Sequence, residues 1–330
     1  MITTEKKSSA FYTRKTSTQK HKSVHSRKKT FILLSMVLPG AIWLLLLRYL
    51  PMFGIVMAFK NFRIYYSAPG LINNIIHSPW VGLDNFRFLF ATNDCWQMLY
   101  NTVGYNVVFI ILGTVISVAF AIMMSELTTK FIMKSYQTLM FFPFFLSWVV
   151  ASYFLYAFLA PGDGLLVHLF PHLAVTKAGW YNYGAPWPYL LIFANMWKNV
   201  GYTVVLYMAT IIGIDSSLFE AARIDGASKW QQIRYVTLPH LRTIIIVLLI
   251  INVGRIFSSD FGLFYTVPMN SGSLIPVTQV VDTYVYRALL GTGDVGMSTA
   301  AGLFQSTVGF VLILITNAIV SKVDPDSAMF

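Results

Sequence analysis

The stretch from Ile214 to Pro239 reads Ile-Asp-Ser-Ser-Leu-Phe-Glu-Ala-Ala-Arg-Ile-Asp-Gly-Ala-Ser-Lys-Trp-Gln-Gln-Ile-Arg-Tyr-Val-Thr-Leu-Pro and joins two long apolar runs. Ser217, followed three residues later by Glu220, has the pattern of a capping box, which predicts the start of a helix. Gly226 predicts an end or bend of that helix, and Pro239 predicts a break before the next apolar run. The stretch therefore predicts a short amphipathic helix with a small-then-bulky apolar stripe (Ala221, Ala222, Ala227, Trp230, Ile233).

A helix tied at both ends to apolar runs has two interpretations. As a rigid element, it can transmit force between a helical bundle and a cytoplasmic partner. Alternatively, it lies in the lipid interface with its apolar side down. The physical pattern of the stretch leaves both interpretations open.

The apolar runs on either side are long enough to cross a membrane. A spanning helix needs about 20 mainly apolar residues, and this chain is 56% hydrophobic and only 11% charged. We expect an all-α membrane protein with six transmembrane helices, at residues 31–59, 100–124, 137–160, 189–214, 243–264 and 299–320.

Charge fixes the expected orientation. The first 30 residues carry nine Lys or Arg and one acidic residue, and we expect residues 1–30 to be a basic, disordered cytoplasmic tail. Such a tail could bind nucleic acid, but a topology signal is the preferred interpretation, so lipid and no nucleic acid is expected as a partner. Basic residues recur in the second and fourth loops and after the last span, which predicts a multi-pass protein of the bacterial plasma (inner) membrane with both termini cytoplasmic. Residues 31–98 would form the first helix and an extracytoplasmic segment.

Polar side chains concentrate near the end of the fifth expected span. Asn252, Arg255, Ser258, Ser259 and Asp260 fall within nine positions, too many for a lipid-facing surface. They could form an internal ion pair or line a watery cavity, and the cavity is preferred. Weaker candidates for the same pathway lie in the fourth and sixth spans (Asn195, Lys198, Asn199, Gln305, Ser306, Thr307).

Two other groups of residues could bind ligands. Aromatic residues near the outer mouth could stack on sugar rings, although anchoring at the membrane interface is preferred (Trp180, Tyr181, Tyr183, Trp187). His168 and His172 lack the further ligands that a metal site needs, so no metal and no catalytic residue is expected.

The loop carries a resemblance to a known family. Glu220-Ala221-Ala222, three residues, Gly226, nine residues and Val236-x-Leu238-Pro239 resemble the EAA loop of ABC importer permeases, with Val236 where the pattern has Ile. The resemblance implies that residues 99–323 form a type I permease core, with a coupling loop at 215–241 that docks on an ATPase subunit. The residues it implies for coupling are Glu220, Ala221, Ala222, Asp225, Gly226, Leu238 and Pro239.

Further stretches resemble the carbohydrate branch of these permeases. They look closest to its polysaccharide or complex-oligosaccharide subfamily, and they lie at Pro51–Gly54, Ser78–Phe86, Asn101-Thr102, Asp282–Arg287 and Ser298–Ser306. The resemblance covers about residues 31–323, so it excludes the basic tail.

The resemblance implies a permease subunit of an ATP-driven oligosaccharide or polysaccharide importer that works by alternating access. The implied partners are a second, non-identical permease subunit, two ABC ATPase subunits, an extracytoplasmic binding protein and the oligosaccharide itself. The chain has no Gly-Lys dipeptide and therefore no Walker A loop. We expect it to be no enzyme and to bind no cofactor, with ATP and Mg²⁺ on the partner ATPases.

Two rival functions make different predictions. An ion-coupled secondary transporter would have inverted repeats and broken helices in matched halves, and no matched halves are evident. A membrane-embedded hydrolase would need a nucleophile and a base within the spans, and no histidine falls in an expected span.

Overall fold

The computed structural model describes residues 25–65, 70–87, 93–127, 129–172 and 179–323. These residues form helices and connections, with one isolated antiparallel bridge, between Lys60 and Trp80. The chain divides into two units, Met1–Phe53 and Gly54–Phe330.

The described residues of the first unit belong to one long apolar helix with changes of winding, which continues past Phe53. Helix α1 (His25–Leu44) continues as a π turn, η1 (Leu45–Tyr49), and then as 3₁₀ turns, η2 (Leu50–Phe59). Because α1 begins at His25, the expectation of a disordered tail is wrong for residues 25–30. The tail before His25 lies outside the described residues.

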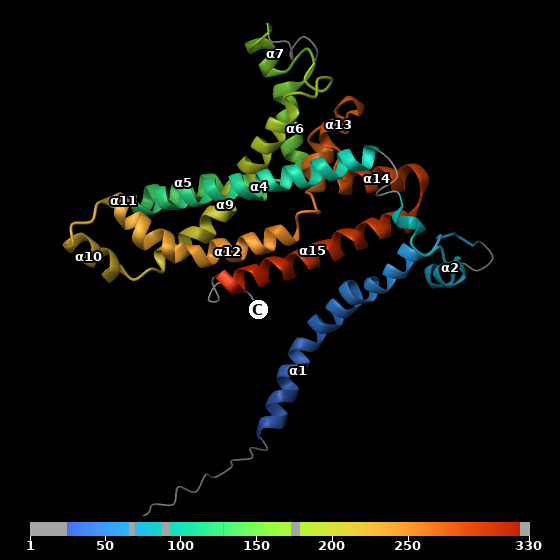
Figure 1. The fold of residues 1–330 in the computed structure, drawn as a ribbon, viewed down its shortest axis with the longest axis horizontal. Helices are drawn as coiled ribbons and strands as arrows, with labels where there is room; N and C mark the ends of the chain where they lie inside the picture. The colour runs from blue at the N-terminus through green and yellow to red at the C-terminus, as the bar shows by residue number, and fades with distance from the viewer. Residues whose placement is uncertain (1–24, 66–69, 88–92, 128, 173–178, 324–330) are drawn as a thin grey trace, which may run out of the picture. The chain divides into compact units, whose positions relative to one another are not determined.

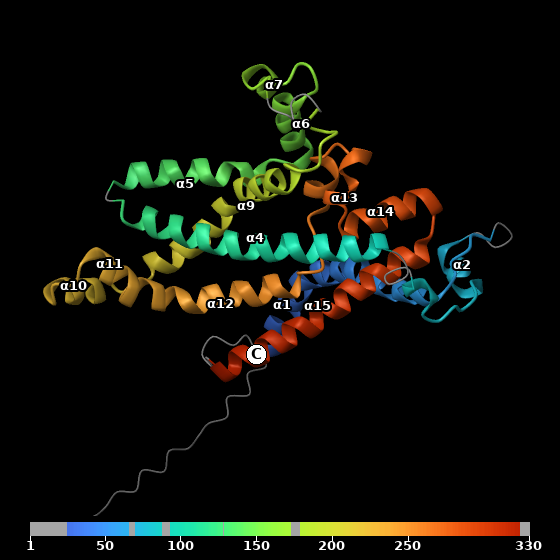
Figure 2. The same ribbon diagram turned by 45° about the horizontal axis from the view of Figure 1, so that its top comes forward.

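In the second unit, the long helices pack side by side. Helix α9 (Trp187–Ile212) packs against α4 (Asn93–Ser125) and α5 (Lys130–Phe145), and α12 (Leu238–Gly254) packs against α15 (Val295–Val323). Figures 1 and 2 show α10 (Ser216–Ile224) and α11 (Lys229–Gln232) at one end of this unit, with α14 (Val281–Thr292) at the other. The remaining short elements are α2 (Leu71–His77), η3 (Asp84–Phe86), α6 (Trp148–Leu159), α7 (Leu165–Leu169), η4 (Ile233–Thr237), η5 (Gly262–Thr266), η6 (Gly272–Leu274) and α13 (Ile275–Thr278).

Among the described residues, four helices are long and apolar enough to cross a membrane. They run over Lys29–Phe59, Cys95–Ser125, Lys229–Gly254 and Val295–Lys322. Two bent pairs, α5 with α6 and α9 with α10, bring the number to as many as six if each pair is one span. The expected spans at 31–59, 100–124 and 299–320 match three of the four, and the fourth expected span, 189–214, falls on α9. The third and fifth expected spans need correction.

The third expected span, 137–160, is not one helix. Helix α5 ends at Phe145, α6 begins at Trp148, and their axes differ by 99°. Pro143, in the last turn of α5, has no N–H to donate. The side chain of Ser147 accepts a hydrogen bond from the N–H of Val150 at 3.2 Å and so caps α6. A proline followed by a capping serine thus separates two helices inside an uninterrupted apolar run.

A lysine from α9 covers this first break. The Nζ of Lys198, which is buried, donates to the carbonyl oxygens of Pro143 (3.4 Å), Phe144 (3.0 Å) and Leu146. A positive charge suits the C-terminal end of a helix, where the last carbonyls lack partners. Gly201 brings α9 close to α5, since a Cβ there would lie 1.8 Å from the carbonyl oxygen of Met140.

The fifth expected span, 243–264, is displaced toward the N-terminus. The helix begins at Lys229, passes through the π turn η4 and ends at Gly254. Pro239 lies inside this continuous helix, directly after the π turn η4, so the predicted break at Pro239 is wrong. Residues 255–260 form a non-helical connection to η5, the second break in a spanning segment.

The aromatic residues expected at the outer mouth belong to the core. Trp187 is fully buried, and its Nε1–H donates to the carbonyl oxygen of Trp180 at 2.7 Å. Trp180 and Tyr181 are also buried, packed with Phe264 in the same cluster. Both interpretations, sugar stacking and interfacial anchoring, are therefore wrong for these three residues, whereas Tyr183 is exposed.

Candidate functional site

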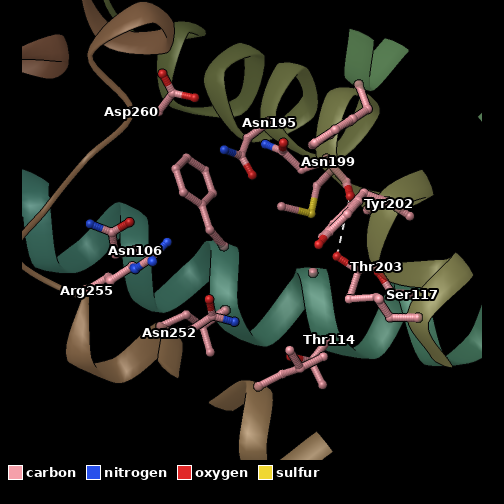
Figure 3. A pocket seen from close by; sticks show the side chains of 18 of the residues that line it. Asn106, Thr114, Ser117, Asn195, Asn199, Tyr202, Thr203, Asn252, Arg255 and Asp260 are labelled. Carbon is pink, nitrogen blue, oxygen red and sulfur yellow. Dashed lines mark hydrogen bonds between the residues drawn. The ribbon is translucent and has the colours of Figure 1, made fainter. Parts of the chain in front are cut away.

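A polar cavity of about 450 Å³ opens among α4, α9, α12 and the second break. Figure 3 shows the amides of Asn195 and Asn199 on the α9 side, with Asn106, Asn252 and Arg255 on the opposite side. Hydroxyl groups and aromatic rings also line the cavity, together with aliphatic side chains (Phe109, Thr114, Ser117, Phe144, Tyr202, Thr203, Tyr207, Ile110, Met196, Val200, Leu206, Leu248).

The candidate pathway residues divide into two groups. Four of them line the cavity: Asn199, Asn252, Arg255 and Asp260. Ser259 and Gln305 are not among the lining residues: Ser259 is part of the second break, and Gln305 holds that break in place through Phe257. Of the group expected within the fifth span, only Asn252 lies on its helix; Arg255, Ser258, Ser259 and Asp260 lie on the connection that follows. A role for any of them on a substrate pathway stays a prediction.

Asn106 of α4 pins the second break from one side. Its amide nitrogen donates to the carbonyl oxygens of Ile256 (2.9 Å) and Ser258 (3.2 Å), and it lies 3.3 Å from the Oγ of Ser259. Irregular backbone at membrane depth is tolerated only where its peptide groups find partners or water. One amide side chain thus satisfies two carbonyls that helix geometry would otherwise satisfy.

Two more helices hold the same six residues. Gln305 of α15 donates to the carbonyl oxygen of Phe257 at 2.7 Å. The carboxylate of Asp282, on α14, accepts the N–H of Ser259 at 2.7 Å and the amide of Gln305 at 3.3 Å. Burial raises the pKa of Asp282, and these two donors act against that rise. The break is therefore fixed by α4, α14 and α15 together.

The carboxylate of Asp260 is engaged with its own surroundings. It accepts the Nε1–H of Trp148 at 2.5 Å, and the N–H groups of Gly262 at 3.0 Å and Leu263 at 3.4 Å. It thereby caps the turn that opens η5, and it connects the second break to α6, which follows the first. Within the described residues, no ion pair joins it to Arg255, so the predicted alternative of an internal ion pair is not what this structure contains.

Several lining residues were not anticipated from the sequence. Asn106, Thr114 and Ser117 lie in the second expected span, and Tyr202 and Thr203 in the fourth. An amide in the middle of an apolar helix is a readable signal, and Asn106 gave one. The hydroxyls gave none, because Ser and Thr in helices commonly bond to a carbonyl of their own helix.

At the other end of the unit, the loop between α9 and α12 folds as two helices around a glycine. Asp215 caps α10 by accepting the N–H of Ser217 at 2.9 Å, and this interaction lowers the pKa of Asp215. The predicted capping box of Ser217 and Glu220 is therefore wrong. Asp, Ser and Ser in succession are all good caps, and the first of them is used.

Gly226 makes the turn between the two helices. Its φ is +76°, a left-handed conformation that suits glycine. A capping box that was not anticipated then starts α11, with the Oγ of Ser228 accepting the N–H of Gln231 and the Gln231 side chain accepting the N–H of Ser228 at 2.7 Å. The end of the first helix at Gly226 is as predicted.

The loop presents apolar and charged side chains outward. None of the residues of α10 is buried, Ile224 is 86% exposed and Trp230 is 68% exposed. Glu220 is exposed on the same helix. Lys229 anchors the loop to the end of α4 through an ion pair with Glu126, at 2.5 Å. The arrangement is an amphipathic element fixed at its base and uncovered at its tip.

The chain is similar to known proteins over most of its length. Residues 110–325 match the family described as binding-protein-dependent transport system inner membrane component. The polygalacturonan/rhamnogalacturonan transport system permease protein YteP of Bacillus subtilis is 31% identical over 87% of this chain and 87% of its own. A bacterial ABC transporter involved in the import of the acidic polysaccharide alginate shares 28% identity and a TM-score of 0.78, over 91% of this chain and 98% of that one. Another structure of the alginate transporter, in complex with a pentasaccharide-bound periplasmic protein, gives a TM-score of 0.76 at 28% identity, over 91% of this chain and 97% of that one.

Proposed function

The chain belongs to the family of binding-protein-dependent transport system inner membrane components, and from this premise we propose that it is one permease subunit of an ATP-driven importer of oligosaccharides or polysaccharides. The named relatives support the substrate class, since they are transporters of polygalacturonan, rhamnogalacturonan and alginate. The chain is a transport component and not an enzyme.

The proposed topology has six spans with both termini in the cytoplasm. The basic residues at the N-terminus, in the second and fourth loops and after the last span support this orientation. In this arrangement the bent pair of α5 and α6 crosses once, and α9 crosses without α10. The loop of α10 and α11 then faces the cytoplasm, and α14 lies toward the outside.

The observation that carries the proposal is the shape of the cytoplasmic loop. Helix α10, the left-handed Gly226 and α11 form an exposed, amphipathic projection that continues directly into the membrane helix Lys229–Gly254. A partner that moves α10 therefore acts on the helix that ends beside the cavity. Interfacial lipid burial would not need this rigid connection.

The proposed assembly has four further components. A second permease subunit, related but not identical, completes the translocation path as a heterodimer. Two ATPase subunits bind Mg-ATP and hold the coupling loops, and the present chain binds no cofactor. An extracytoplasmic binding protein delivers the saccharide, as the pentasaccharide-bound periplasmic protein of the alginate transporter structure suggests. ATP-driven closure of the ATPases moves the loops, and the cavity alternates between the two sides.

The test is ATP hydrolysis by the purified assembly in lipid nanodiscs, with and without saccharide-loaded binding protein. The variant Gly226→Val places a β-branched residue at a φ of +76° and distorts the loop tip. The control Ser216→Ala changes an exposed residue of α10, the helix that precedes Gly226. Since coupling free energies are about 1–3 kcal/mol, we expect stimulation to fall about 5- to 150-fold in Gly226→Val alone.

Assembly must be measured beside activity. Co-elution of the ATPase with Gly226→Val would show that coupling, and not association, is lost. Absence of any associated ATPase from the native chain would contradict the proposed function. So would normal stimulation and transport by Gly226→Val.

A further inference from the structure

Arg255 gives the cavity a preference for a negatively charged ligand. This inference rests on the proposed function and specifies its substrate. We propose that the cavity is a saccharide site, and that Arg255 recognises the carboxylate of an acidic sugar. The ligand class is a short oligosaccharide of uronic acid units.

Arg255 brings a positive charge to the wall of the cavity. Its side chain is exposed into the cavity, and within the described residues its guanidinium makes no hydrogen bond and no ion pair. A cation at the end of a membrane helix is costly and is expected to face water or an anion. A guanidinium binds a carboxylate through two parallel hydrogen bonds, which makes a carboxylate its best-matched ligand.

The carboxylate of Asp260 is already hydrogen-bonded within the chain. Asp260 also lines the cavity, but its oxygens accept donors from Trp148, Gly262 and Leu263. These contacts fix Asp260 as the cap of η5, so it does not neutralise Arg255. Arg255 and Asp260 are the charged side chains among the described residues that line the cavity.

Neutral polar side chains also line the cavity. Asn195, Asn199 and Asn252 each present an amide side chain that makes no hydrogen bond within the described part of the chain. Amides and hydroxyls that both donate and accept suit the hydroxyl groups of a sugar, because each can pair with a group of either kind.

The aromatic rings and the volume of the cavity also suit a saccharide. Phe109 and Tyr202 border the same space, and sugar rings pack against aromatic faces through their apolar C–H surfaces. The volume of about 450 Å³ lies inside the range of small-molecule sites, about 300–1,000 Å³. The rigid attachment of the second break to α4, α14 and α15 holds Arg255 at a fixed place relative to the amides.

The experiment compares trigalacturonate with its fully methyl-esterified form, which has the same sugar backbone without the charge. Binding of each probe to the complete assembly in nanodiscs is measured by saturation-transfer NMR, in the absence of binding protein. The native assembly should bind the acid in preference to the ester. Arg255→Gln should lower that preference by about tenfold or more, and Arg255→Lys should restore part of it.

A matched variant separates charge recognition from loss of the cavity. Asn252→Ala, on the same wall, should weaken the acid and the ester equally. The inference is overturned if the native assembly does not bind trigalacturonate, or binds the ester as well. An unchanged acid preference in Arg255→Gln overturns it too. Failure of the proposed function is a separate result, because it appears in the nucleotide-dependent coupling of the Gly226→Val experiment and not in this binding.

Discussion

The two breaks in the spanning helices solve one problem in opposite ways. At the first, between α5 and α6, the exposed carbonyl oxygens are covered by the buried ammonium group of Lys198. At the second, residues 255–260, the backbone is satisfied by Asn106, Asp282 and Gln305. The cation at the second break, Arg255, is left facing the cavity.

The difference shows which break has a charged group free to bind a ligand and which does not. A lysine consumed by carbonyl oxygens has no hydrogen-bonding capacity left for a ligand, so the first break is structural. An arginine beside peptides that other side chains already satisfy keeps its whole guanidinium for a ligand. Two positive charges, each beside a break, therefore differ: Lys198 is buried on carbonyl oxygens, whereas Arg255 is exposed.

Removing the ammonium group of Lys198 should lower the stability of the protein more than any other change considered below. Lys198→Met keeps the length of the side chain but leaves up to three carbonyls unpaired, and each unsatisfied buried group costs about 1–3 kcal/mol. We expect a large loss of folded protein in detergent, measured by fluorescence-detected size-exclusion chromatography after heating. Lys198→Arg should retain most of the stability, and a Met variant as heat-resistant as the native chain would show that the lysine does not seal the break.

Close helix contacts next to each break should be second in size. A Cβ on Gly201 would lie 1.8 Å from the Met140 carbonyl oxygen, and one on Gly309 would lie 2.3 Å from that of Gly254. Over-packing costs about 1–3 kcal/mol, so Gly201→Ala and Gly309→Ala should both lower the midpoint of thermal unfolding.

The control for these contacts is Gly302→Ala, also on α15. A Cβ at Gly302 would have nothing within 4 Å, and alanine favours a helix over glycine by up to about 1 kcal/mol. Its midpoint should be unchanged or higher. Equal losses in all three variants would mean that glycine flexibility, and not helix contact, matters here.

A smaller effect is expected from the amide that holds the second break. Gln305→Leu removes the donor to the carbonyl oxygen of Phe257 and should cost about 1 kcal/mol. Hydrogen exchange measured by mass spectrometry should become faster in the peptide that contains residues 255–260. Ser306→Ala, whose hydroxyl bonds only within its own helix, should leave that exchange as it is.

The smallest effect on stability should come from Arg255→Met. With no intramolecular partner in the described chain, the guanidinium contributes little to folding, and we expect a change within about 0.5 kcal/mol. The same thermal assay as for Lys198→Met makes the comparison direct. A loss as large as that of Lys198→Met would show that Arg255 serves the fold, and would count against its role as a ligand group.

The sequence predicted the helical membrane fold and the glycine-centred loop because both depend on local composition and spacing. It did not predict the breaks, because their causes are distant. Lys198 covers carbonyls more than 50 positions earlier, and Asn106 holds peptides 150 positions later. An apolar run without these partners is indistinguishable from a straight span.

The candidate cavity was predictable in part for the same reason. The cluster from Asn252 to Asp260 was visible because its polar residues are close in sequence. The wall with Ser117, Tyr202 and Thr203 is assembled only when α4 and α9 pack together. The capping residue Asp215 was missed because three good caps stand side by side, and only the backbone conformation selects one.

The exposed tip of the loop formed by α10 and α11 has a consequence for biogenesis. Ile224 and Trp230 stand open to water in the single chain, and on the proposed function an ATPase covers them. A copy made without its partner would present this apolar patch to chaperones and proteases, which act on such surfaces. The residues that transmit motion in the finished transporter would also mark unassembled copies for removal, and so keep the numbers of the two subunits matched.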